Sequence, residues 1–122
     1  MKGIRDEKGF TLIEIIVVII ILGILSVIAI PKYLDLRADA EKGVAKGVTA
    51  ALRGQIAISH ARYLMDNTQV YDATTIADIE TDGVTMSSGA GTIEAEFESL
   101  NTYEWTYTAR NGTTPARVTP NW

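Results

Sequence analysis

The feature that most constrains the fold is an apolar run near the start of the sequence, FTLIEIIVVIIILGILSVIAIP, which spans residues 10–31. These 22 residues carry a single charge, the carboxylate of Glu14, and the next charged residue is Lys32. As an α-helix, 22 residues reach about 33 Å, which is enough to cross a hydrocarbon core about 30 Å thick. A carboxylate in that core costs roughly 2.5–3.5 kcal/mol on insertion scales, so Glu14 needs a functional explanation.

The residues around the start and end of this run predict how it is oriented in a membrane and whether it is removed from the mature chain. Lys2, Arg5 and Lys8 precede it, which predicts a cytoplasmic N-terminus and the bulk of the chain on the other side of the membrane. A secretory signal peptide would end in a small-residue cleavage site after the apolar run, and SVIAIPKYL offers no such site. The small residue at the boundary is Gly9, before the run. We therefore expect residues 10–31 to remain in the mature chain.

Charge is unevenly distributed along the 122 residues, whose net charge is −4. Residues 32–62 carry six bases against three acids, whereas residues 63–122 carry nine acids against two arginines. If copies of the chain pack side by side, the basic residues 32–62 of one copy would attract the acidic residues 63–122 of another. The overall acidity argues against a nucleic acid partner. The chain has no cysteine, which excludes disulfides and thiolate metal sites.

Residues 32–64 predict an amphipathic continuation of the helix, separated from the apolar run by Pro31. A proline inside a helical pattern predicts a bend or a loosened turn. Gly43, Gly47 and Gly54 weaken a helix by about 1 kcal/mol each relative to alanine. Close approach to the head's own sheet or to a neighbouring helix would explain them, and simple tolerance is the alternative. The predicted buried stripe is Val44, Val48, Leu52 and Ile56, widened by Ala45, Ala51, Ser59 and Tyr63.

Residues 65–122 predict a small β-rich head. TIEAEFESL (92–100) and YEWTYTAR (103–110) alternate core-facing and outward side chains, and TTPARVT (113–119) returns as their partner after a two-residue turn at Asn111-Gly112. Prolines 115 and 120 place this last strand at an edge. We expect residues 66–91 to be a polar connection, with a short helix near 75–80 and a glycine-rich loop at 87–91. The side chains expected to face the core are Ile93, Ala95, Phe97, Ser99, Tyr103, Trp105, Tyr107 and Ala109.

The predicted fold class is therefore α+β, a long N-terminal α-helix packed on a small antiparallel sheet of three to four strands. Other motifs have plain structural explanations. DIETDG (78–83) copies the opening spacing of a calcium loop, but Gly89 stands where the bidentate glutamate would be. His60 has no evident base or nucleophile beside it, so we expect a surface or packing role. The sequence contains no triad, phosphate loop or metal cluster, and we predict neither an enzyme nor a cofactor.

The stretch KGFTLIEIIVVIIILGILSVIAIP resembles the N-terminal signature of type IV pilins and type II secretion pseudopilins. The resemblance covers residues 8–64, and beyond Pro31 it is strongest to pilins of the mannose-sensitive haemagglutinin type. It implies that a prepilin peptidase removes the leader, residues 1–9, by cutting between Gly9 and Phe10. It further implies that Phe10 is N-methylated, that Glu14 governs assembly, and that Gly23 and Pro31 bracket a stretch where the helix loosens in the filament.

Cleavage at this junction would explain why the apolar run carries Glu14. The new amino group of Phe10 and the carboxylate of Glu14 would both lie in an apolar environment, where a charge is tolerable chiefly when it is paired. Pairing between one subunit's Glu14 and its neighbour's Phe10 would relieve both charges only in the correct register. The alternative is that Glu14 extends to the cytoplasmic interface as an incidental charge.

The resemblance implies a structural subunit that polymerises through its N-terminal helix into a type IV pilus for adhesion or motility. The first alternative is a pseudopilin of a type II secretion system, and the second is an uncleaved membrane-anchored binding protein. The implied partners are further copies of the chain, the prepilin peptidase, the inner membrane and the assembly machinery. The implied location is the bacterial inner membrane for the precursor, followed by an extracellular pilus, or the periplasm for a pseudopilin.

Overall fold

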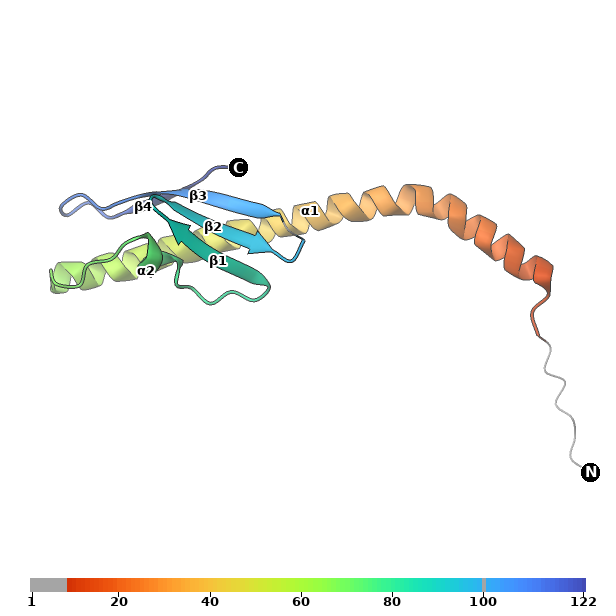
Figure 1. The fold of residues 1–122 in the computed structure, drawn as a ribbon, viewed down its shortest axis with the longest axis horizontal. Helices are drawn as coiled ribbons and strands as arrows, with labels where there is room; N and C mark the ends of the chain where they lie inside the picture. Colours follow the sequence, from red (N-terminus) through yellow and green to blue (C-terminus); the bar gives the residue numbers. More distant parts are fainter. Residues whose placement is uncertain (1–8, 100) are drawn as a thin grey trace, which may run out of the picture. The chain divides into compact units, whose positions relative to one another are not determined.

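The computed structural model describes residues 9–99 and 101–122 (Figure 1). The described chain divides into two compact units, one ending at Asp39 and the other beginning at Ala40. The second unit, called the head below, contains the C-terminal part of the long helix and the whole sheet. Most of the predicted leader, residues 1–8, lies outside the described residues. The elements are α1 (Leu12–Met65), α2 (Ala73–Ala77), β1 (Val84–Gly89), β2 (Thr92–Phe97), β3 (Thr102–Thr108) and β4 (Arg117–Pro120).

The sheet is an antiparallel meander with the order β1-β2-β3-β4, laid on the C-terminal part of α1 (Figure 1). The α+β prediction with four strands is confirmed, and so is the position of β4 at an edge. Gly89 pairs with Thr92, so β1 and β2 are joined by a two-residue turn in which Gly91 has a φ of 92°. This left-handed conformation favours glycine.

Strand β1 corrects the prediction of a polar connection and a glycine-rich loop. Only Val84 and Met86 of this strand are even half-buried, so VTMSSG shows little apolar alternation. Its backbone pairs along the whole of β2, from Val84 opposite Phe97 to Gly89 opposite Thr92. Pairing with a well-patterned neighbour, rather than its own side chains, makes this segment a strand.

The face of α1 that is buried against the sheet is close to the buried stripe predicted from the sequence, but two residues of that stripe were predicted wrongly. Ala45, Val48, Leu52 and Ile56 are buried, but Val44 is 48% exposed and Ala51 is also exposed. A row of every fourth residue drifts by about 40° per step around a helix of 3.6 residues per turn, so Val44 falls outside the face that meets the sheet. The residues that replace them are polar, namely Thr49 and His60.

Trp105 on β3 is the largest fully buried side chain, and its indole Nε1 donates a 2.8 Å hydrogen bond to Thr49 Oγ1 on α1. Thr49 in turn donates to the carbonyl oxygen of Ala45, at 2.9 Å. The predicted inward residues of β2 and β3 are confirmed as far as Phe97 and Tyr107. The last residue expected on each strand lies beyond its end: Ser99 is half-buried in a turn, and Ala109 is exposed.

His60 has the packing role that was predicted, and it closes the distal end of the head. Its Nε2 lies 3.0 Å from the carbonyl oxygen of Thr113 and therefore donates, which leaves Nδ1 to accept from the Tyr71 hydroxyl at 2.9 Å. The same hydroxyl oxygen accepts the backbone N–H of Ala116 at 3.3 Å. This network ties the β3–β4 hairpin to α1. The hairpin loop is Gly112 and Thr113, one residue later than predicted.

The short helix α2 begins two residues before its predicted start, because Asp72 caps it. The carboxylate of Asp72 accepts hydrogen bonds from the backbone N–H of Thr75, at 2.9 Å, and from the Thr75 hydroxyl, at 3.0 Å. These bonds hold the pKa of Asp72 below its ordinary value. α2 then buries Ile76 completely against the sheet.

Candidate functional site

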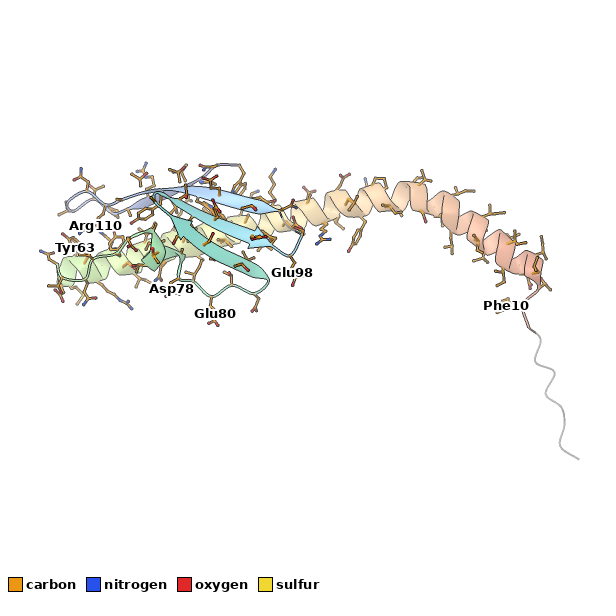
Figure 2. All side chains as sticks on the ribbon, in the orientation of Figure 1. Phe10, Tyr63, Asp78, Glu80, Glu98 and Arg110 are labelled. Atoms are coloured by element: carbon orange, nitrogen blue, oxygen red, sulfur yellow. The ribbon has the colours of Figure 1, made fainter. Side chains whose placement is uncertain are left out.

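The candidate site is the N-terminal part of α1, where every residue from 9 to 40 is exposed. Its apolar side chains are therefore not buried by any of the residues that the structure describes. Phe10, at the start of the segment, is 84% exposed (Figure 2). α1 is long and apolar enough to cross a membrane. An exposed apolar surface of this extent marks a site of membrane or protein association.

Glu14 forms a capping box with Thr11 at the first turn of α1. One carboxylate oxygen of Glu14 accepts the backbone N–H of Thr11 at 2.7 Å and the Thr11 hydroxyl at 2.8 Å. The backbone N–H of Glu14 donates to the Thr11 hydroxyl at 3.4 Å. Thr11 was missed as a functional residue, although the spacing T-x-x-E before an apolar run is the sequence signature of this cap.

The geometry brings Phe10 and Glu14 to the same end of the helix. Both line one shallow apolar groove of about 580 Å³, together with Ile13 and Val17. Glu14 Oε2 takes both Thr11 donors, so the second oxygen of the carboxylate is left for a further donor.

The other polar side chain inside the apolar run is also satisfied within its own helix. The Ser26 hydroxyl donates a 2.7 Å hydrogen bond to the carbonyl oxygen of Leu22. In hydrocarbon an unsatisfied hydroxyl would be penalised, so this back-bonding suits a membrane segment. The apolar run therefore presents Glu14 as its one charged group.

α1 is continuous through Gly23 and Pro31. Pro31 therefore does not end the helix. A bend or a loosened turn at Pro31, and loosening between Gly23 and Pro31 in an assembled filament, stay predictions. A Cβ atom added at Gly43, Gly47 or Gly54 would meet nothing within 4 Å. Close approach to the head's own sheet is thus ruled out as the reason for these glycines, and a neighbouring helix or simple tolerance remains.

The calcium-loop spacing at residues 78–83 leads into a strand rather than into the rest of a cation loop. Val84 to Gly89 form β1, which removes the loop conformation that the later ligand positions need. Within residues 9–99 and 101–122, no three side chains of His, Asp or Glu converge in a way that could hold a metal ion.

Comparison with known proteins matches the same N-terminal region. Residues 4–30 match the family described as the prokaryotic N-terminal methylation motif. The chain is 46% identical over 52 residues to the type IV narrow pilus major component of Thermus thermophilus, covering 43% of this chain and 45% of that protein. It is 43% identical over 63 residues to the type II secretion system core protein G of Pseudomonas aeruginosa, covering 52% and 42%.

A third relative gives the longest match of these three. The type IV major pilin protein of Neisseria gonorrhoeae is 36% identical over 78 residues, which cover 61% of this chain and 47% of that protein. The chain thus spans less than half the length of each of these relatives. No solved structure matches it significantly. The methylation motif and these relatives support an assignment of the N-terminal region to the type IV pilin and type II secretion pseudopilin family.

Proposed function

We propose that this chain is a pilin subunit, which is held in the inner membrane by residues 10–31 and then polymerises through the same helix into a type IV pilus. One observation carries the proposal: the most apolar segment of the chain is exposed along its whole length in the single chain, and its one charge, Glu14, lies inside the matched methylation motif, one turn after the predicted cleavage junction between Gly9 and Phe10. Such a surface is stable only when lipid or other copies cover it.

The proposed mechanism uses Glu14 as the register-setting group. In the membrane the capping box satisfies part of the carboxylate locally. During assembly, the methylated amino group of a neighbour's Phe10 pairs with Glu14, and the apolar side chains of adjacent helices replace lipid around the pair. Because a buried charge without a partner is strongly penalised, only the paired register is stable.

A pseudopilus of a type II secretion system is the second candidate. The relation to the secretion core protein G of Pseudomonas aeruginosa favours it, and the same helix would serve both assemblies. The distinguishing features are filament length and location, on the cell surface or in the periplasm. An uncleaved membrane-anchored protein is the third candidate, and its chain would keep residues 1–9.

Mass spectrometry of the chain recovered from sheared surface filaments tests the proposal. We expect a mature chain beginning at methylated Phe10 in the filament fraction. Recovery of the chain only from membranes with Met1 intact would support the uncleaved anchor. Cleaved chain confined to the periplasmic side, with no surface filaments, would support the pseudopilin.

A further inference from the structure

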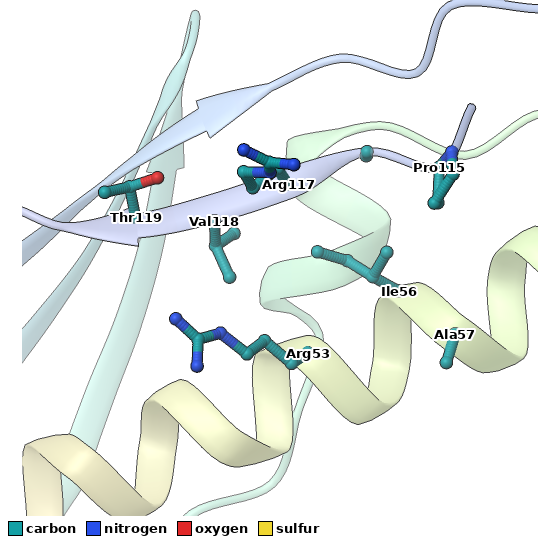
Figure 3. Close-up of a pocket in the computed structure, with 8 residues that line it drawn as sticks. Arg53, Ile56, Ala57, Pro115, Arg117, Val118 and Thr119 are labelled. Carbon is teal, nitrogen blue, oxygen red and sulfur yellow. The ribbon is translucent and has the colours of Figure 1, made fainter.

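A groove on one edge of the head has the character of a receptor for carboxylates. It lies between α1 and the edge strand β4, has a volume of about 500 Å³, and is lined by apolar side chains that include Ile56, Val118 and Pro115 (Figure 3). Arg53 extends from α1 on one side of Val118, and Arg117 lies along β4 on the other (Figure 3). We call this surface the arginine groove.

Both arginines are exposed, and neither has a hydrogen-bond or ion-pair partner among residues 9–99 and 101–122. Arg110 shows the contrast, because its guanidinium stacks 3.6 Å from the centre of the Tyr63 ring. Guanidinium groups bind carboxylates with two parallel hydrogen bonds, and Arg53 and Arg117 offer one such group on each side of the edge strand β4 (Figure 3). The arginine groove is therefore suited to an acidic segment that carries some apolar surface.

The chain itself supplies such a segment at the opposite edge of the sheet. The loop between α2 and β1 exposes the carboxylates of Asp78, Glu80 and Asp82, and Figure 2 shows Asp78 and Glu80 on the β1 side of the head. We call residues 78–82 the acidic loop. Half-buried Ile79 packs against the core, and the Thr81 hydroxyl lies 3.3 Å from the carbonyl oxygen of Val84. These contacts hold the loop while its carboxylates face outward.

Within one head the acidic loop and the arginine groove cannot bind each other, because the sheet order puts β1 and β4 at opposite edges. We propose that the arginine groove of one copy receives the acidic loop of a second copy. The two surfaces differ, so the contact is heterologous, and a heterologous contact that does not close into a ring propagates as a helical filament. This inference rests on the proposed filament function and names the head-to-head contact that accompanies helix packing.

Charge reversal tests the contact in cells that assemble the full chain. We expect Arg53→Glu with Arg117→Glu to lower the yield of sheared filaments about tenfold or more, since like charges would then face each other. Asp78→Lys with Glu80→Lys should have the same effect, and the four substitutions together should restore most of the yield. The matched control for the acidic-loop variant is Glu94→Lys with Glu96→Lys, which makes the same charge change on exposed positions of β2 and should leave the yield within about twofold of wild type.

Cysteine cross-linking tests proximity directly, because the natural chain contains no cysteine. A disulfide requires Cα atoms within about 7 Å, so Arg117→Cys with Glu80→Cys should give a ladder of dimers, trimers and longer species in oxidised filaments. The pair Arg117→Cys with Glu94→Cys should give no ladder. Circular dichroism of each variant checks that the exposed substitutions leave the fold intact.

The outcomes separate this inference from the function on which it rests. Wild-type chains that leave no filaments, on the surface or in the periplasm, overturn both. Filaments at unchanged yield in the arginine-reversed variant, with no ladder from positions 80 and 117, overturn the head-to-head contact and leave the filament function standing. Equal loss of yield in the control would reduce the effect to net charge and also overturn the contact. Filaments that form normally but lose another bound protein would assign the arginine groove to that protein instead.

Discussion

The two halves of α1 are one continuous helix with opposite relations to their surroundings. Ile20, in the first half, is 56% exposed, whereas Ile56, in the second half, is 5% exposed. The first half is the more apolar of the two and buries nothing, while the second carries several charges and buries a full face. The difference shows that burial follows the available partner: the head's own sheet covers one half, and no described residue covers the other.

The halves also differ in how they satisfy polar groups. In the first half, Glu14 and Ser26 find partners within one turn of their own helix. In the head, the decisive bonds span long sequence separations, from Trp105 to Thr49 and from His60 to Thr113. Changes in one region should therefore leave the other intact, and four predictions test this independence.

The largest expected effect is on assembly, from Glu14→Ala. Membrane insertion and leader removal should persist, because the substitution removes a charge and leaves Gly9 and Phe10 unchanged. Filaments should be lost, since each neighbour's amino group would be buried unpaired, a loss of roughly 3–5 kcal/mol. Filament yield after shearing measures this. Thr11→Val is the matched control: it removes the capping hydroxyl and keeps the carboxylate, so a loss of filaments equal to that of Glu14→Ala would assign the effect to the cap.

The second effect is on head stability, from Trp105→Ala. This substitution empties the fully buried indole site and leaves Thr49 without its donor, so we expect a loss of about 3–5 kcal/mol in the free energy of unfolding. Urea unfolding of the full chain in detergent, followed by Trp122 fluorescence, measures it. Ile20→Ala in the same detergent should leave the unfolding midpoint unchanged. A comparable shift from Ile20→Ala would show that the two regions are energetically coupled.

A smaller effect should come from the α2 cap. Asp72→Ala should lower the head's stability by about 1 kcal/mol at neutral pH, because Thr75 loses its acceptor. The folded-state pKa of Asp72 lies below its ordinary value, so the ionised carboxylate stabilises the head fully at pH values above the ordinary aspartate pKa of about 3.9. That contribution is lost as the pH falls through the lowered pKa. Asp72→Asn, which caps without titrating, should not show this acid-dependent loss, and the same loss in that variant would contradict the assignment.

The smallest expected effects come from Gly47→Ala, and they concern the stability of the isolated chain and the yield of filaments. Gly47→Ala should stabilise the isolated chain by about 1 kcal/mol or less, because the added methyl meets nothing within 4 Å and alanine favours the helix. If a neighbouring helix approaches closely in the filament, the same substitution should lower filament yield. Thermal unfolding and shearing assays together measure both responses. Unchanged yield with higher stability would support simple tolerance of the glycine.

The strands of the head differ in how clearly their own residues predict them. The alternation in β2 and β3 identified Ile93, Phe97 and Trp105 correctly, because strands with one buried face carry their orientation in their own side chains. β1 carries almost no such pattern and becomes a strand through pairing with β2. The hydrogen-bond partners of Thr49 and His60 could not be predicted either, since they lie 56 and 53 residues away in the chain.

The sequence by itself determined the apolar N-terminal helix and the position of its one carboxylate, and it predicts the junction before Phe10. These properties depend on local composition and spacing, which the order of residues states directly. Only the tertiary structure decided which helical face the sheet covers, why Val44 is exposed, and that Arg53 and Arg117 flank the edge strand β4 while the acidic loop lies at the opposite edge of the sheet. Such relations arise from packing between distant segments, and no local pattern encodes them.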